Sequence, residues 1–221
     1  MYYEIDVQQK WQLISYKLIE HNYEFNVSRI YEFDNLDRDT FCYTIKELIK
    51  HHESLRTCFS EVNGIIKHKI YKPNEVEPDT ELIDISENDE EKLNKLLNIH
   101  RRFFFDLEKV PLFKIKIFRT NGKSVCLFIM SHVIGDDVSF NIIERDFKTI
   151  YLSIEKGEKV DLLGRKKQLK DYFEWKKSQI HSEIGKKALN FWRTKISQSS
   201  TSIQNKDKLT TFFKDKLAFF F

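Results

Sequence analysis

The stretch Met130-Ser131-His132-Val133-Ile134-Gly135-Asp136-Asp137 determines how the rest of this chain is interpreted. It follows an apolar run, Ser124 to Met130, and precedes a segment with helical periodicity, Ser139 to Lys156. A histidine at the exit of a buried strand has a fixed backbone and a restricted water supply. Those conditions allow an imidazole to act as a general base near neutral pH. His132 is therefore the first candidate for a catalytic residue.

The residues on both sides of this stretch alternate between helix and strand patterns. Hairpins are expected around Asn63-Gly64 and Asn121-Gly122, because this dipeptide favours a two-residue turn. Helices are expected over about residues 6–21, 39–49, 86–97, 139–156, 168–179 and 182–196, and further strands over 25–33 and 81–85. Ser86 and Asp89 are expected to form a capping arrangement at the start of the third helix. This order predicts an α/β fold in which a mixed, largely antiparallel sheet is covered by helices.

The spacing of apolar residues also predicts which helix faces are buried. Asp6 is expected to cap the first helix. The second helix is expected to begin at Asp39 or Thr40. The expected buried side chains are Trp11, Ile14, Leu18 and Ile19 in the first helix, and Phe41, Ile45, Leu48 and Ile49 in the second.

Composition excludes several classes of protein. The chain has 221 residues, of which 41% are hydrophobic, so it can bury a sizeable core. A net charge of +3 does not suggest a nucleic-acid binder, and no apolar run approaches the ~20 residues of a membrane span. The chain opens without a signal segment, and its three cysteines are embedded in apolar segments. We therefore expect a cytoplasmic protein with reduced thiols.

The composition changes near the C-terminus. Residues 197–202 are rich in serine, and Leu209 to Phe221 is a short apolar tail with interspersed lysines. We expect one domain over residues 1–197, followed by a linker and tail over 198–221. Such a tail indicates a chain that has been cut short or a segment that needs a partner surface.

Several separated segments together resemble the condensation domains of non-ribosomal peptide synthetases, within the chloramphenicol-acetyltransferase-like acyltransferases. The signature of that family is two histidines, three free positions, then aspartate and glycine, which corresponds here to Ser131 through Asp137. The resemblance extends from about Gln8 to Ile196. The other matching segments are Gln8-Gln9-Lys10-Trp11, His51 to Phe59, Phe105-Asp106-Leu107 with Pro111-Leu112, Asp171 to Trp175, and Phe191-Trp192.

The resemblance implies a reaction. Such domains join two substrates that are tethered by phosphopantetheine thioesters to carrier proteins, and the acceptor amine attacks the donor carbonyl to form an amide. His132 would deprotonate or orient that amine. An α-amine has a pKa near ~8, so positioning can matter more than basicity.

The same resemblance assigns supporting roles to four residues. Asp136 would pair with Arg56 and shape the loop, since an arginine–carboxylate bridge is geometrically stiff. Ser131 replaces the first histidine of the signature, and Asp137 replaces its glycine. Aspartate tolerates the left-handed backbone region better than most residues.

The chain matches only the first of the two lobes that a complete family member has. The smaller chloramphenicol acetyltransferases carry their histidine near the C-terminus, whereas His132 lies mid-chain, which favours a half-domain. One interpretation is the N-terminal lobe of an acyltransferase that needs a second lobe. The alternatives are a non-catalytic interaction module that binds carrier or synthetase partners, and an oligomer in which another copy supplies the missing wall.

Other polar and reactive residues are interpreted as structural. His51 and His52 are expected to be structural or solvent-facing, and Cys126 is expected to lie in the core. Paired lysines at 166–167, 176–177 and 186–187 are interpreted as solvated helix faces, with attraction of acidic carrier proteins as the alternative. The chain has no phosphate-binding glycine loop and no paired-cysteine metal site. We expect no cofactor bound by the chain itself, phosphopantetheine on its partners, and no contact with nucleic acid or membrane. Donor and acceptor identity are not specified by the sequence.

Overall fold

A computed structural model of the chain describes residues 2–19, 22–85, 89–120, 123–162 and 167–198. These fall into two units, each considered by itself: residues 1–60 with 66–169, and residues 61–65 with 170–221. The linker and tail expected over 198–221 lie outside the described residues, apart from Gln198. No helix among the described residues is long and apolar enough to cross a membrane.

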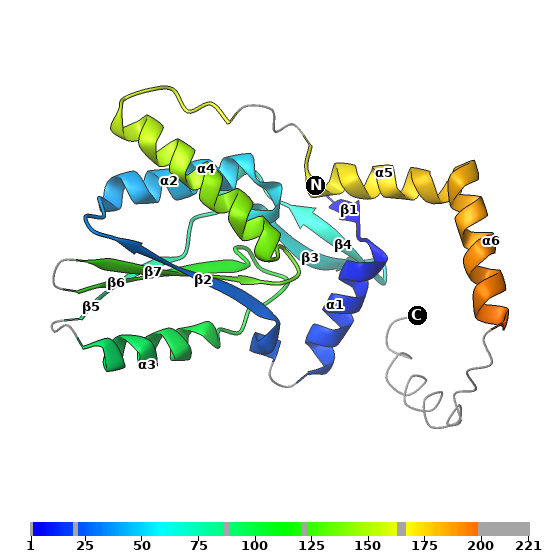
Figure 1. The fold of residues 1–221 in the computed structure, drawn as a ribbon, viewed down its shortest axis with the longest axis horizontal. Helices are drawn as coiled ribbons and strands as arrows, with labels where there is room; N and C mark the ends of the chain where they lie inside the picture. The colour runs from blue at the N-terminus through cyan, green and yellow to red at the C-terminus, as the bar shows by residue number, and fades with distance from the viewer. Residues whose placement is uncertain (1, 20–21, 86–88, 121–122, 163–166, 199–221) are drawn as a thin grey trace. The chain divides into compact units, whose positions relative to one another are not determined.

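A four-stranded sheet forms the centre of the first unit (Figure 1). Its order is β2 (Asn26–Phe33), β7 (Ser124–Ser131), β6 (Phe113–Arg119) and β5 (Thr80–Asp84). β7 pairs antiparallel with both β2 and β6, while β5 pairs parallel with β6. The sheet is therefore mixed and largely antiparallel, as predicted. The turn expected at Asn121-Gly122 lies outside the described residues, but the two strands that flank it pair as a hairpin.

A second sheet has the order β1 (Tyr2–Glu4), β4 (Ile65–Ile70) and β3 (Thr57–Val62). Asn63 and Gly64 join β3 to β4 with φ angles of 54° and 76°. Two successive residues with positive φ are typical of the type I′ turn, which confirms the predicted hairpin. β1 was not predicted, because three residues are too few to show a period.

Helices connect and flank the strands, close to their predicted positions. Asp37 caps the second helix by accepting a hydrogen bond from the Thr40 amide at 2.7 Å, two residues before the predicted start. The helices are α1 (Val7–Leu18), α2 (Arg38–His51), α3 (Glu90–Arg101), α4 (Asp137–Glu155), α5 (Leu169–His181) and α6 (Glu183–Gln198). Three short 3₁₀ turns complete the set: η1 (Asn22–Phe25), η2 (Glu53–Arg56) and η3 (Pro73–Glu75).

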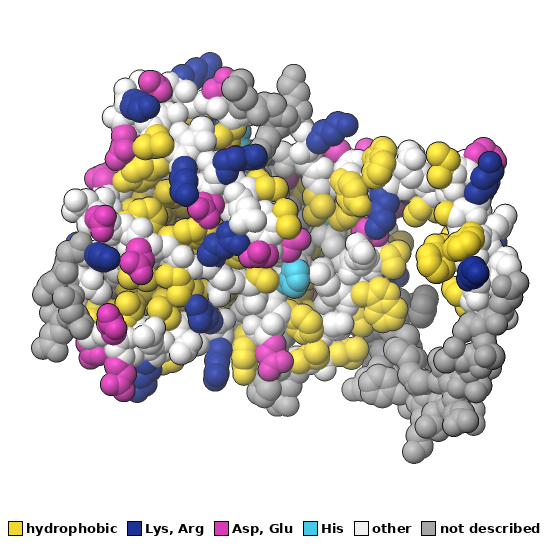
Figure 2. Space-filling view, viewed as in Figure 1, with side chains coloured by type: hydrophobic (Ala, Val, Ile, Leu, Met, Phe, Trp, Pro, Cys, Tyr) yellow, Lys and Arg dark blue, Asp and Glu magenta, His cyan; other side chains and the backbone are white. Residues whose placement is uncertain are grey.

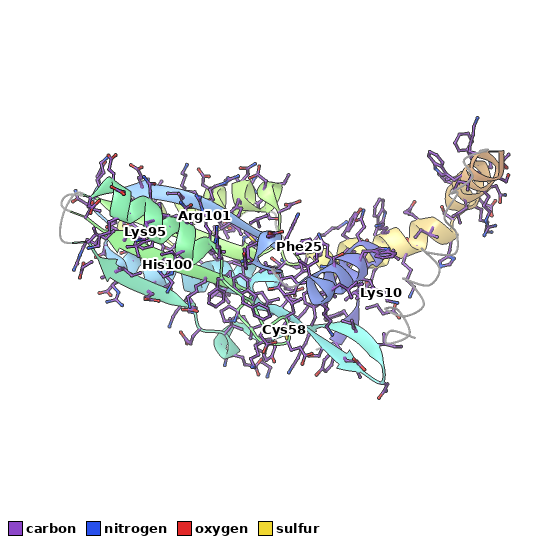
Figure 3. The ribbon with its side chains drawn as sticks, turned by 90° about the horizontal axis from the view of Figure 1, so that it is seen from below. Lys10, Phe25, Cys58, Lys95, His100 and Arg101 are labelled. Carbon is purple, nitrogen blue, oxygen red and sulfur yellow. The ribbon has the colours of Figure 1, made fainter. Side chains whose placement is uncertain are left out.

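Helices cover both faces of the four-stranded sheet. α2 and α4 lie on one face and α3 on the other, as Figure 1 shows; Figure 3 views the sheet from the α3 side. Successive side chains of a strand point to opposite faces of the sheet, so neighbouring residues contact different helices. Phe128 of β7 contacts Phe140 of α4, with ring centroids 5.5 Å apart. Phe118 of β6 contacts His100 of α3 on the opposite face, at 5.7 Å.

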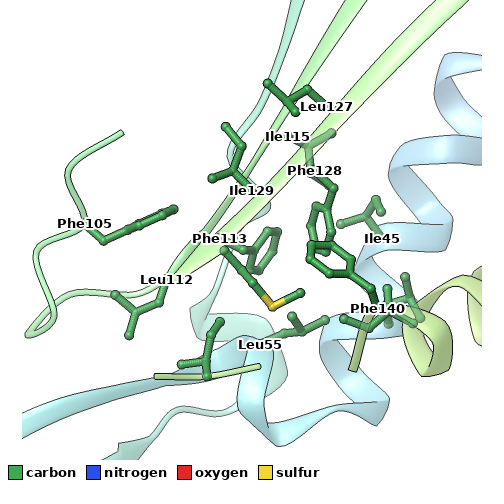
Figure 4. Packing of buried hydrophobic residues seen from close by; sticks show 14 of the residues in the cluster. Ile45, Leu55, Phe105, Leu112, Phe113, Ile115, Leu127, Phe128, Ile129 and Phe140 are labelled. Carbon is green, nitrogen blue, oxygen red and sulfur yellow. The ribbon is translucent and has the colours of Figure 1, made fainter. Parts of the chain in front are cut away.

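The core is densest around β7. All eight residues of this strand are buried, because neighbouring strands cover both edges and helices cover both faces. Figure 4 shows Ile115, Phe128 and Phe140 packed together on one side, with Leu127 and Ile129 on the other. The predicted buried face of α2 is confirmed, since Phe41, Ile45, Leu48 and Ile49 are all buried.

The predicted buried face of α1 is partly wrong. Ile14 is buried, but Trp11 and Leu18 are 53% and 44% exposed, and Ile19 lies just beyond the helix and is also exposed. The inner face instead contains Gln9, Leu13, Ile14 and Tyr16. Two of these carry polar groups that hydrogen-bond in the interior, so apolar periodicity alone selected the wrong face. Asp6 occupies the cap position of α1 as predicted, without a side-chain capping bond.

In the second unit, α5 and α6 meet at a close turn. A Cβ on Gly185 would lie 2.3 Å from the Gln179 carbonyl oxygen, so only glycine fits there. Both helices expose large apolar side chains, which Figure 2 shows along them. The exposed residues are Tyr172, Trp175, Ile180, Ile184, Leu189, Phe191, Trp192 and Ile196.

Truncating the core at β7 is expected to destabilise the first unit. Ile129 is fully buried, so Ile129→Ala should lower the free energy of unfolding by about 3 kcal/mol. The matched control is Ile99→Ala on α3, whose side chain is 55% exposed and whose loss should change stability by less than about 0.5 kcal/mol. Urea unfolding followed by circular dichroism compares the two, and equal effects would contradict the central position of β7.

Candidate active site at the end of strand β7

The loop between β7 and α4 is held by backbone hydrogen bonds from two separate parts of the chain. The Ser131 amide donates to the Leu112 carbonyl at 3.0 Å, and the His132 amide donates to the Phe25 carbonyl at 2.9 Å. The Ile134 amide then donates back to the Ser131 carbonyl at 3.1 Å, which closes a tight turn. The backbone of His132 is therefore fixed on both sides.

The imidazole of His132 is half-buried and oriented by its own loop. Its Nδ1 lies 3.0 Å from the carbonyl oxygen of Gly135. A carbonyl oxygen only accepts hydrogen bonds, so Nδ1 carries the proton in the neutral ring and Nε2 keeps its lone pair. No hydrogen bond joins Nε2 to the part of the chain that the structure describes. This arrangement presents Nε2 as the atom that could accept a proton.

Asp136 caps the N-terminus of α4. Its Oδ1 accepts hydrogen bonds from the Ser139 amide at 2.8 Å and the Ser139 hydroxyl at 2.7 Å, and Ser139 Oγ accepts from the Asp136 amide. The bonds from Ser139 lower the pKa of Asp136, and His132 lowers it further. The carboxylate therefore stays ionised at the helix N-terminus, where negative charge is stabilising.

The expected ion pair between Arg56 and Asp136 is absent, and that prediction was wrong. Arg56 instead donates to the Tyr71 carbonyl and lies 3.5 Å from a carboxylate oxygen of Glu53. Both partners are thus engaged locally, Arg56 beside its own 3₁₀ turn and Asp136 in its helix cap. Arg56 supports the start of β3, and any effect on His132 is indirect.

A different arginine contacts the loop. Arg29 on β2 pairs with the carboxylate of Asp137 at 2.5 Å, and its guanidinium lies 5.2 Å from the centre of the Phe140 ring. Sequence reasoning missed Arg29, since its place follows only from the β2–β7 register, in which Arg29 lies opposite Phe128. Asp137, at the position of the family glycine, therefore ties the loop to the edge strand.

Ser131, at the position of the first signature histidine, is fully buried. Its Oγ has no hydrogen-bond partner among the described residues. A hydroxyl here does not reach the imidazole, so His132 is oriented by Gly135 and not by its neighbour in sequence.

Gly135 allows the loop to pass close to the core. A Cβ there would lie 2.6 Å from Met130 Sδ and 3.2 Å from Ser139 Cβ. This close approach lies two positions before Asp137, the residue at the position of the signature glycine.

A buried pair lies behind the loop. His52 Nε2 lies 2.8 Å from Asp146 Oδ2, which joins the end of α2 to α4. Burial lowers the pKa of His52, although Asp146 opposes the shift. His52 is therefore structural, which is one of its two expected roles. Its partner Asp146 was not predicted, because the contact depends on how α4 packs against the end of α2.

A cavity of about 580 Å³ is lined in part by His52. Met130, Ile134 and Ser139 connect its wall to the His132 loop, and Arg145, Lys167 and Gln168 contribute polar groups. Within the described ranges, no group of three or more His, Cys, Asp or Glu side chains could hold a metal ion.

A family model described as the condensation domain matches residues 1–216. The chain belongs to the condensation-domain family. Tyrocidine synthase 3 of Brevibacillus parabrevis is 29% identical over 193 residues, which are 86% of this chain and 3% of that protein. Bacitracin synthase 3 of Bacillus licheniformis is 31% identical over 161 residues, which are 70% of this chain and 2% of that protein.

Solved structures agree on the fold of this condensation-family chain. The epimerization domain from the third module of tyrocidine synthetase B matches with a TM-score of 0.78 at 18% identity, over 91% of this chain and 47% of that one. A starter condensation domain of rhizomide synthetase matches with a TM-score of 0.79 at 12% identity, over 90% and 49%. The chain thus spans about half the length of these solved chains.

Substituting Gly135 is expected to displace the loop. Gly135→Ala should lower the free energy of unfolding by about 1–3 kcal/mol, because the new methyl group overlaps Met130 Sδ. The double variant Gly135→Ala with Met130→Ala should cost less than the sum of the two single changes, since the second removes the overlapping atom. Chemical denaturation of all three variants measures this coupling, and strict additivity would contradict the close contact.

The buried His52 is expected to make stability depend on pH. Because burial lowers its pKa in the folded state, the unfolded chain binds a proton first as the pH falls. Its contribution is complete above the unfolded pKa of ~6.5 and is lost on acidification below it. His52→Gln should therefore give a shallower decline in the free energy of unfolding between about pH 7 and pH 5. Equal slopes for variant and native chain would refute this role.

Proposed function

We propose that this chain is the N-terminal lobe of a condensation-type acyltransferase, with His132 as its central catalytic residue. The observation that carries the proposal is the orientation of the imidazole. Its Nδ1 is engaged by Gly135 and its Nε2 keeps a lone pair, at the end of a strand whose backbone is fixed. The family match and the half-length coverage of solved relatives support the same assignment.

The proposed reaction forms an amide between two carrier-bound substrates. The amine nitrogen of the acceptor attacks the thioester carbonyl of the donor, the C–N bond forms and the C–S bond breaks. The amine proton passes to Nε2 of His132 and then to the departing phosphopantetheine sulfur. The chain itself holds no cofactor in this scheme, and phosphopantetheine is supplied by the carrier proteins.

A second lobe would complete the site. Closing a site aligns two reactants and excludes water, and one lobe supplies only one wall. The exposed aromatic and aliphatic side chains of α5 and α6 fit a surface that a further protein part covers. Another copy of this chain is the alternative source of that wall.

A non-catalytic interaction module is the second candidate function. Two observations favour it: the Ser131 hydroxyl, at the position of a histidine, makes no hydrogen bond to His132, and the arginine bridge to Asp136 is absent. Such a module would bind carrier or synthetase partners without turnover.

A reconstituted condensation assay separates the two candidates. The chain is mixed with a C-terminal lobe from a complete family member and two loaded carrier proteins, and amide product is measured by mass spectrometry. His132→Ala should lower the rate by about 100-fold or more. The control His51→Ala changes a histidine that pairs with Glu47 on the helix surface and should leave the rate unchanged.

Equal product from native chain and His132→Ala would remove His132 from the mechanism. Carrier binding without product from any variant would favour the interaction module.

A further inference from the structure

Gln9 is a buried polar residue on α1 that touches the His132 loop from outside it. Its side chain is among the few polar groups in the core, 7% exposed. Gln9 Nε2 donates a hydrogen bond to the Val133 carbonyl at 3.1 Å, across 124 positions of sequence. Its Oε1 lies 2.5 Å from Nε2 of His68 on β4. One amide therefore links the second sheet, α1 and the candidate catalytic loop.

The donor and the acceptor can be assigned in both hydrogen bonds of Gln9. The Val133 carbonyl only accepts, so the amide nitrogen of Gln9 must face it. The Gln9 oxygen then faces His68 and also only accepts, so His68 Nε2 must carry a proton. Burial lowers the pKa of His68 to about 4, so the ring is neutral near pH 7 and its single proton sits on Nε2. His68 thus donates to Gln9, and Gln9 donates to Val133.

The peptide between Val133 and Ile134 is held from both sides, because its N–H donates to the Ser131 carbonyl at 3.1 Å and its carbonyl accepts from Gln9 at 3.1 Å. The Leu112 and Phe25 carbonyls fix the amides of Ser131 and His132, on the incoming side. The peptide after Val133 lies between His132 and Gly135, whose carbonyl accepts from His132 Nδ1. Without Gln9 the bond from the Ile134 N–H would be the one remaining hydrogen bond that this peptide makes among the described residues, and a tilt of the peptide would move the Gly135 oxygen relative to the imidazole.

We propose that Gln9 is a positioning residue for His132, with His68 as its anchor. By holding the Val133 carbonyl, Gln9 keeps the Gly135 oxygen against Nδ1 and so keeps the lone pair on Nε2. The catalytic meaning of this arrangement rests on the proposed function, whereas the effect on the imidazole does not.

Side-chain chemistry restricts which residues can serve at position 9. A glutamine offers one donor and one acceptor at the end of a chain long enough to reach both partners. A glutamate would place a second acceptor against the Val133 carbonyl. A methionine has similar length and fills the space without a hydrogen bond to either side.

Imidazole ¹⁵N spectroscopy of the full chain tests the proposal near pH 7.5. His132→Ala identifies the His132 signals by their loss. The native chain should show a protonated Nδ1 and an unprotonated Nε2 at His132. Gln9→Met should convert these into averaged signals of both tautomers, whereas the control Gln8→Met, at an exposed neighbour on the same helix, should leave them unchanged.

Two variants of His68 test the proposal independently of whether Gln9→Met folds. His68→Gln retains an N–H donor toward Gln9 and should preserve the His132 tautomer. His68→Leu lacks that donor and should give averaged signals. An unaltered Nδ1-protonated His132 in folded Gln9→Met, or in folded His68→Leu, would overturn the proposal.

The same variants in the reconstituted assay distinguish this proposal from the proposed function. Gln9→Met should lower kcat by about tenfold while KM for the loaded carriers changes by less than about twofold, because orientation and not binding is lost. If the tautomer responds to Gln9 but His132→Ala still forms product at the native rate, the positioning role stands and the catalytic assignment of His132 fails.

Discussion

The burial of β7 on all sides is the constraint on which the rest of this structure depends. The strand lies between β2 and β6, with α2 and α4 over one face and α3 over the other. A strand enclosed in this way cannot shift its register by one residue without turning its apolar side chains the wrong way. The point at which β7 ends, and therefore the place of His132, is fixed by the core and not by the loop.

Local patterns in the sequence predicted the elements well, and contacts between distant elements poorly. The buried face of α2 was predictable because its inner residues are all apolar and evenly spaced. The face of α1 was not, since Gln9 lies inside and Trp11 outside. Asp136 and Ser139 are three residues apart, so their cap is a local feature. The Arg29–Asp137 pair depends on strand register, which no local pattern specifies.

In this member of the condensation family, His132 occupies the second histidine position of the signature, and Ser131 and Asp137 occupy the positions of the first histidine and the glycine. The tight approach to the core occurs at Gly135, two positions before the signature glycine. Asp137 occupies the latter position and binds an arginine on the edge strand. Three contacts therefore stabilise the loop: the helix cap between Asp136 and Ser139, the ion pair of Asp137 with Arg29 on β2, and the close packing of Gly135 against Met130.

The pairing of β2 with β7 has a consequence for how the chain folds during synthesis. Asn26 and Ser131 are partners in the register, so β2, the first strand of the four-stranded sheet to be synthesised, waits for most of the first unit to leave the ribosome. Closing a loop of that length is entropically slow, and contacts so distant in sequence form late. Until then the nascent chain carries an unpaired strand, and early assistance from a chaperone would benefit this polypeptide more than one built from local hairpins.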